Sequence, residues 1–188
     1  MPGLIDRARD AVIGVVKGAG DIVDAVRSTA TDLVTGALRG AGEVTSAAVG
    51  VVTDTVKGAL RGSKEAGVEL TDSAKGVVSG AVEAVASVGG DVVAGARNAV
   101  RAAIQGASEV GGDVAGTAVA AVEGAVDAAG RVGKDVVTVG REAAHQALET
   151  TGEVSKDAVD AVKRGLQAAA SVPRDVVESV VKGSDDKA

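Results

Sequence analysis

The sequence predicts an all-α protein without β-sheet, and three observations support this fold class. Acidic residues recur every eleven positions in the first part of the chain, which is the length of three helical turns. Apolar residues occupy the positions of each unit that lie together on an 11/3 helix, and charged residues occupy the opposite stripe. A strand has a period of two, which would scatter this pattern over both faces.

The acidic residues define the repeat. Up to residue 65 they are Asp10, Asp21, Asp32, Glu43, Asp54 and Glu65. After four additional residues at 76–79, the phase returns at intervals of 22 residues, at Asp91, Asp113, Asp135 and Asp157. We interpret residues 1–188 as a single hendecad-repeat region with a phase shift near 76–79 and a break near 168–175.

Two architectures fit this repeat. The preferred one is a long amphipathic 11/3 helix, because the two changes of phase nearly cancel and leave one straight apolar face. The alternative is a few shorter antiparallel helices that form a helical bundle, with turns at Ser87–Asp91, Glu109–Asp113 and Ser171–Asp175. In each turn an Asp follows a Gly or Pro and is expected to cap the next helix.

Helix propensity does not stabilise these helices by itself. The chain contains 27 glycines, and each glycine inside a helix costs about 1 kcal/mol relative to Ala. Ion pairs between residues four positions apart, such as Arg61/Glu65 and Arg131/Asp135, stabilise a helix by at most ~0.5 kcal/mol each. We therefore expect an isolated helix to be weak in water, so that the apolar face must pack against lipid or other helices.

The repeat identifies two sets of candidate interaction residues. The apolar face is represented by Val12, Val23, Val34, Val56, Val93 and Val137. Glycines spaced by four residues allow a neighbouring backbone to approach closely, although they can also simply keep a face flat. In the first half of the chain they are Gly14 and Gly18, Gly36 and Gly40, and Gly58 and Gly62.

No residue pattern indicates a catalytic, cofactor-binding or metal site. The chain has no Cys, and its single histidine, His145, lies in the polar stripe. There are no aromatic side chains on which bases could stack. The longest uncharged stretch, Val44 to Thr53, is far shorter than the about 20 residues of a membrane span. We expect no enzyme activity, no nucleic-acid or small-molecule partner, and no ordinary transmembrane span.

The repeat pattern resembles that of known lipid-surface proteins. Segments such as Leu33-Val-Thr-Gly-Ala-Leu38, Ser79-Gly-Ala-Val-Glu-Ala-Val85 and Glu123-Gly-Ala-Val-Asp127 resemble the repeats of perilipins and synucleins. The resemblance extends more distantly to exchangeable apolipoproteins and group-3 late-embryogenesis-abundant proteins. It implies a chain that is disordered in water and helical on a lipid surface. Synuclein-like repeats are rich in lysine, whereas this chain has a net charge of −6.

These observations lead to a function hypothesis with two alternatives. The first is a non-catalytic coat on lipid droplets or weakly charged membranes, bound through the Val/Ala/Gly face. One alternative is a self-assembling structural homo-oligomer, built as a right-handed or straight bundle, tube or filament. The other is protection during desiccation or stress. The expected partner is thus a lipid surface or copies of the chain itself. The charged residues near the start of the sequence do not fit a secretory signal, so we expect a cytoplasmic protein that can be peripheral on a membrane or droplet.

Overall fold

The computed structural model describes residues 3–18, 20–41 and 44–185, and these residues form nine α-helices and no strand. The helices are α1 (Leu4–Val16), α2 (Ile22–Gly40), α3 (Val44–Glu65), α4 (Leu70–Ser87), α5 (Val92–Glu109), α6 (Val114–Arg131), α7 (Val136–Val154), α8 (Lys156–Ala168) and α9 (Arg174–Asp185). The all-α prediction is confirmed. The preferred arrangement as one long helix is wrong, because the chain folds back after each helix.

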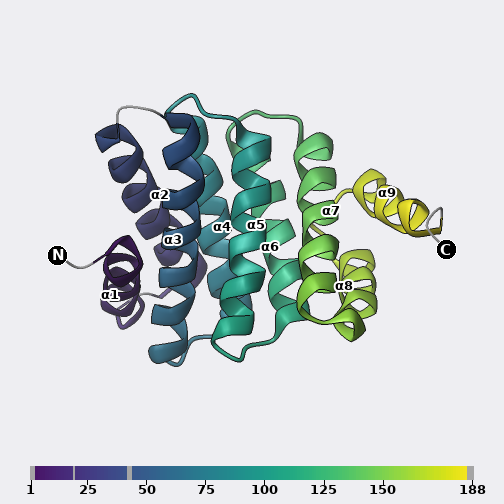
Figure 1. Ribbon diagram of the computed structural model, residues 1–188, viewed down its shortest axis with the longest axis horizontal. Helices are drawn as coiled ribbons and strands as arrows, with labels where there is room; N and C mark the ends of the chain where they lie inside the picture. The colour runs from purple at the N-terminus through teal and green to yellow at the C-terminus, as the bar shows by residue number, and fades with distance from the viewer. Residues whose placement is uncertain (1–2, 19, 42–43, 186–188) are drawn as a thin grey trace.

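The helices form two layers, and each helix packs beside the one that follows two places later. In Figure 1, α3, α5 and α7 lie in front, while α2, α4 and α6 lie behind them. The helices α1 and α8 extend the two layers at opposite ends, and α9 packs against α7 and α8. The first and last helices, α1 and α9, therefore lie at opposite ends of the stack (Figure 1). This arrangement of stacked helix pairs is an α-solenoid.

Four glycines with positive φ end helices in the same way. They are Gly67, Gly89, Gly111 and Gly133, with φ between 66° and 75°. At Gly89, the N–H of the next residue, Gly90, donates to the carbonyl of Val85 at 2.9 Å. This bond satisfies a carbonyl at the helix end, as in a Schellman motif. A side chain would strain the backbone there, so glycine permits the sharp reversal that separates antiparallel helices.

Carboxylates cap the helices that follow these turns. The N-cap residues after the four glycines are Glu69, Asp91, Asp113 and Asp135, spaced by 22 residues. Three of them accept hydrogen bonds from amides of the first turn, while Glu69 makes no such bond. The turns predicted at Ser87–Asp91 and Glu109–Asp113 are confirmed. One 22-residue interval therefore corresponds to one helix with its turn.

Two predicted irregularities have other structural origins. Residues 76–79, where the phase shift was predicted, lie inside the continuous helix α4. The four residues in excess of the repeat are instead accommodated in α3, which has 22 residues, whereas α4 has 18. The chain does break between Ala168 and Arg174, but Asp175 lies within the first turn of α9 rather than at its N-cap. Glu43, one of the predicted acidic positions, lies outside the described residues.

The core lies between the two layers and consists of small apolar side chains. Among the described residues its largest fully buried side chains include Leu38, Leu60, Ile104 and Leu166, and most of the remainder are Val and Ala. The apolar face of each helix is therefore covered by other helices of the same chain. In the described part of the chain, no helix has the length and apolarity needed to cross a bilayer.

Candidate binding pocket

The predicted apolar face is mostly directed into the core. Val12, Val34 and Val56 are fully buried, with exposed fractions of 1% or less. Val93 and Val137 are partly buried and pack against the core cluster, and Val23 is likewise partly buried. These side chains contact helices of this chain, so the folded solenoid does not present them as one continuous outer surface.

The predicted close-packing glycines fall into two groups. Gly58 and Gly62 of α3 lie against the backbone of α1, and a Cβ added at Gly62 would stand 2.5 Å from the Arg9 carbonyl oxygen. The other four, Gly14, Gly18, Gly36 and Gly40, would meet no atom within 4 Å. Sequence spacing alone does not distinguish the groups. Only Gly58 and Gly62 lie where a preceding helix of the same layer packs against them.

The charged stripe forms ion pairs between neighbouring helices of a layer. Glu83 of α4 accepts hydrogen bonds from Arg27 of α2 at 3.1 Å and from Arg131 of α6 at 3.3 Å. Glu109 of α5 accepts from Lys57 at 2.7 Å and Arg61 at 3.0 Å, both in α3. Arg61 and Arg131 thus reach across to another helix instead of forming the local pairs predicted from sequence.

These ion pairs affect the titration of one carboxyl group. The hydrogen bond from Lys57 holds the pKa of Glu109 below its ordinary value; burial opposes this shift, and Arg61 supports it. Charged hydrogen bonds favour the ionised form of their acceptor. The carboxylate therefore remains charged and links α3 to α5.

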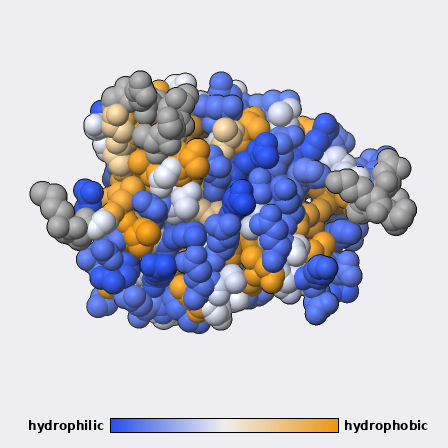
Figure 2. Space-filling model, in the orientation of Figure 1, coloured by the Kyte–Doolittle hydropathy of each residue, from blue (hydrophilic) through white to orange (hydrophobic). Residues whose placement is uncertain are grey.

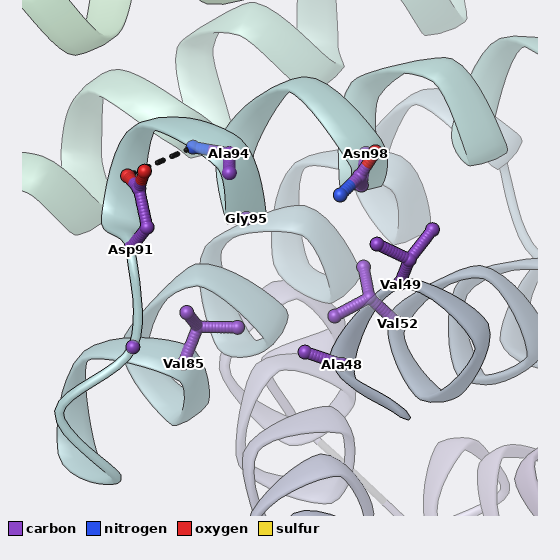
Figure 3. A pocket seen from close by; sticks show the side chains of 9 residues that line it. Ala48, Val49, Val52, Val85, Asp91, Ala94, Gly95 and Asn98 are labelled. Carbon is purple, nitrogen blue, oxygen red and sulfur yellow. Dashed lines mark hydrogen bonds between the residues drawn. The ribbon is translucent and has the colours of Figure 1, made fainter. Parts of the chain in front are cut away.

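An apolar pocket of about 220 Å³ lies between α3, α4 and α5. Its lining residues are Ala48, Val49 and Val52 of α3, Val85 of α4, Gly90 in the turn, and Asp91, Ala94, Gly95 and Asn98 at the start of α5. Figure 3 shows Val49 and Val52 on the α3 side of the gap and Asn98 on the α5 side. The walls are thus almost entirely apolar, with polar groups only from Asp91 and Asn98.

The residue at one repeat position differs between the helices and bears on this gap. Asn98 is the seventh residue after the N-cap Asp91, and the equivalent residues are Gly76 in α4, Ala120 in α6 and Glu142 in α7. A Cβ at Gly76 would stand 2.5 Å from the Val23 carbonyl oxygen, so α2 and α4 pack backbone to backbone. The larger Asn98 side chain prevents α3 and α5 from approaching in this way, and the space beside it stays open.

The two polar side chains of the pocket differ in their hydrogen bonding. One carboxylate oxygen of Asp91 accepts from the amides of Val93 at 2.9 Å and Ala94 at 3.1 Å, and so caps α5. The half-buried amide of Asn98 makes no hydrogen bond to any residue that the structure describes. An amide offers two donors and one acceptor group. Asn98 is therefore the side chain in the pocket with free hydrogen-bond donors, whereas Asp91 can only accept.

An exposed apolar side chain lies at the edge of the pocket. Val49 is 46% exposed, the highest value among the described large apolar residues; Val15 and Val154 follow at 39% and 38%. Figure 2 shows apolar surface over α2 and α3 at the N-terminal end, whereas hydrophilic residues cover much of α5 and α7.

Neither Val49 nor Asn98 is among the candidate residues predicted from the sequence. Asn98 is the single asparagine of the chain and occupies a repeat position that is Gly in α4, Ala in α6 and Glu in α7. Aligning the 22-residue units by their N-caps would have shown that this position varies in size. His145 is exposed on α7, and the described residues contain no group of three His, Cys, Asp or Glu side chains suited to a metal ion.

Comparisons with known proteins give a structural neighbour but no family. No protein-family model matches the sequence, and no curated protein matches it. Among solved structures, the crystal structure of the de novo designed helical repeat protein DHR7 aligns with a TM-score of 0.49 and 20% sequence identity. The alignment covers 85% of this chain and 95% of DHR7.

Proposed function

We propose that the protein is a non-catalytic coat protein of weakly charged lipid surfaces, and that the two-layer solenoid is its lipid-free form. The observation that carries the proposal is the composition of the helix contacts. Valines of the predicted lipid-binding face, such as Val34 and Val56, are buried against other small side chains of the same chain. Lipid tails are as apolar as these side chains, so a lipid surface can replace the helix contacts.

The absence of aromatic residues from the sequence supports this exchange. Aromatic side chains contribute the largest buried areas and specific contacts in most cores, and this chain has none. Separating two helices here therefore breaks many small apolar contacts, each of which lipid can replace. The short turns at Gly89 and Gly111 then act as joints between amphipathic helices.

The charge of the protein favours a neutral or weakly charged surface. The net charge is −6, and the N-cap carboxylates Asp91, Asp113 and Asp135 are exposed at the ends of their helices. An anionic membrane would repel them within about 8 Å at physiological salt. A droplet covered by a phosphatidylcholine monolayer presents no net charge and matches the apolar face.

Self-assembly receives less support from the geometry. An assembly through the apolar face would need Val12, Val34 and Val56 at the surface, and all three are buried within one chain. Extended homo-oligomers normally need a contiguous exposed apolar patch. The lipid-coat proposal needs the same residues, but it supplies an external apolar phase that can replace the intramolecular contacts.

A disulfide that ties α2 to α4 tests whether opening is required. The hydroxyl oxygens of Thr35 and Ser87 lie 3.5 Å apart, close enough for two sulfurs to bond after a small adjustment. The chain contains no other Cys. The double variant Thr35→Cys/Ser87→Cys should bind triolein droplets coated with phosphatidylcholine several-fold less when oxidised than when reduced.

The single variant Thr35→Cys, treated with the same oxidant, provides the matched control and should bind as the wild type does. Co-flotation of the protein with the droplets measures the bound fraction. Failure of the wild-type protein to float with the droplets would overturn the lipid proposal. Equal flotation of the oxidised and reduced double variant would overturn the opening step.

A further inference from the structure

We propose that the pocket between α3 and α5 binds a short, uncharged alkyl chain that ends in a hydroxyl or carbonyl group. This site goes beyond the proposed coat function, because it belongs to the closed solenoid and holds a single small molecule. The alkyl chain lies between Val49, Val52 and Val85, and its polar end hydrogen-bonds to the amide of Asn98.

The size of the pocket limits the length of the ligand's alkyl chain. Its volume of about 220 Å³ is below the range of about 300–1,000 Å³ that is usual for sites of drug-sized ligands. Because Gly90, Gly95 and the alanines provide no large side chains, the walls are smooth and present methyl groups and backbone. A linear chain of a few carbon atoms fills such a space more completely than a branched or aromatic body.

The polar groups of the pocket set the chemistry of the ligand's end. Asn98 has unused donors and an unused acceptor and faces the gap (Figure 3). A half-buried amide of this kind gains a hydrogen bond from a hydroxyl or carbonyl group that displaces loosely held water. Asp91 can only accept, through the one carboxylate oxygen that does not cap α5, so Asn98 is the lining side chain that can also donate.

The charges around the pocket exclude an anionic end group. The nine lining residues include no Lys or Arg, and Asp91 places a carboxylate at the rim. A fatty-acid carboxylate would lose hydration without gaining a cationic partner and would be repelled by Asp91. An alcohol of the same length meets neither penalty. The site therefore discriminates between alcohol and acid with the same alkyl chain.

Nuclear magnetic resonance provides a direct test, because Asn98 is the single asparagine of the chain. Its side-chain NH₂ signals are accompanied only by those of three glutamines, Gln105, Gln146 and Gln167. Titration of the ¹⁵N-labelled protein with 1-octanol should shift the Asn98 NH₂ signals and the Val49 backbone amide in a saturable way. Octanoate at the same concentrations should leave these signals unchanged.

Two variants separate the hydrogen bond from the pocket volume. Asn98→Leu keeps a side chain of similar size but removes the amide, and should weaken octanol binding about fivefold, the effect of one hydrogen bond. Ala48→Leu fills the pocket and should abolish binding. Gln105→Leu is the matched control, because Gln105 is also a half-buried amide on α5 but does not line the pocket; it should bind octanol like the wild type.

The proposal is overturned if octanol leaves the Asn98 signals unchanged, if octanoate binds as tightly as octanol, or if Ala48→Leu binds normally. The oxidised Thr35→Cys/Ser87→Cys variant should still bind octanol, because its crosslink lies between α2 and α4. Octanol binding without droplet binding would overturn the coat function alone. Droplet binding without octanol binding would overturn the pocket proposal alone.

Discussion

Gly80 of α4 lies directly against the carbonyl oxygen of Arg27 in α2, which occupies the space that a Cβ would need. The guanidinium of the same arginine reaches Glu83, less than one helical turn beyond Gly80. Arg27 thus contacts α4 twice, through its backbone and through its side chain. The close approach allowed by glycine brings the ion pair within reach, so that packing and charge specify the same register between α2 and α4.

Replacing Gly80 by Ala should destabilise the fold, although Ala favours the helix by about 1 kcal/mol. The added methyl group would overlap the Arg27 carbonyl and separate α2 from α4, and overpacking of this kind costs about 1–3 kcal/mol. Gly36→Ala is the matched control, because a Cβ there meets no atom within 4 Å. It should stabilise the protein by about 0.5–1 kcal/mol.

Urea unfolding followed by circular dichroism measures both variants. Stabilisation by Gly80→Ala similar to that by Gly36→Ala would show that α2 and α4 are not in backbone contact in solution. The comparison also tests the distinction between glycines in close contact and glycines in open space. The sequence does not make this distinction, because Gly36 belongs to the same kind of four-residue pair as Gly58.

Gly111→Ala tests the backbone conformation at a turn. Gly111 has φ of +66°, and a Cβ would contact nothing within 4 Å, so only the backbone cost remains. An L-residue in this region costs about 1–2 kcal/mol. We expect that loss in the free energy of unfolding for Gly111→Ala and a smaller loss for Gly111→Asn, since Asn tolerates this conformation. Equal losses for Ala and Asn would contradict the assigned turn.

The helix caps predict unequal effects at two equivalent positions. The Asp113 side chain accepts a hydrogen bond from the Gly116 amide at 3.0 Å, whereas Glu69 makes no cap bond. Asp113→Ala should therefore cost about 1 kcal/mol, and Glu69→Ala should leave the unfolding midpoint nearly unchanged. Thermal or urea unfolding checks the difference. A larger loss for Glu69→Ala than for Asp113→Ala would contradict the cap assignment.

The Glu109 cluster predicts a pH dependence of stability. The pKa of Glu109 in the fold is lowered, first by the hydrogen bond from Lys57. A carboxyl group with a lowered folded pKa stabilises the fold fully above its unfolded pKa. The ordinary pKa of this carboxyl group is 4.5. The contribution is lost as the pH falls from that value through the lower pKa that Glu109 has in the fold. The contribution is at most about 1 kcal/mol, because the carboxylate is partly solvated.

Glu109→Gln should therefore lower the urea midpoint at pH 7 and reduce the loss of stability between pH 5 and pH 3. Glu178→Gln serves as the control, because its pair with Lys182 is highly exposed, with side-chain fractions of 65% and 80%. A wild-type stability loss in acid that Glu109→Gln leaves unchanged would mean that other carboxyl groups cause it.

The closed core predicts the behaviour of the chain in dilute buffer. The valines and alanines between the layers are buried by the chain itself, so the far-ultraviolet circular dichroism should be strongly helical without lipid. The signal should also be independent of protein concentration, since no second chain is required. Weak helicity that increases only with lipid would mean that the solenoid does not form without a surface.

Local patterns in the sequence predicted much of the helix placement. The 11-residue period distinguishes the buried and exposed faces, and Gly-Gly-Asp at residues 89–91 and 111–113 predicts a helix end followed by a cap. The turns at Gly67 and Gly133 were not predicted. Each has a single glycine two residues before an acidic residue, which is a weaker signal than the doubled glycine.

The pocket residues could not be found from periodicity. Asn98 and Val49 are separated by 49 positions in the chain, and they line one space because α5 packs beside α3. The repeat describes each residue only relative to its own helix axis. Which residue lies opposite it depends on the antiparallel folding of three successive helices.

Sequence patterns within about 22 residues determine which segments are helical and where the helices end. They also determine that Val34 and Val56 face inward and Asp91 faces outward, because the hydrogen bonding and the amphipathicity of a helix are local. Folding of the helices into layers determined that Gly58 and Gly80 are close contacts while Gly36 is open. These pairings are distant along the chain, and many small contacts together select them. A period repeated along one axis contains no information about which helix becomes the neighbour of another.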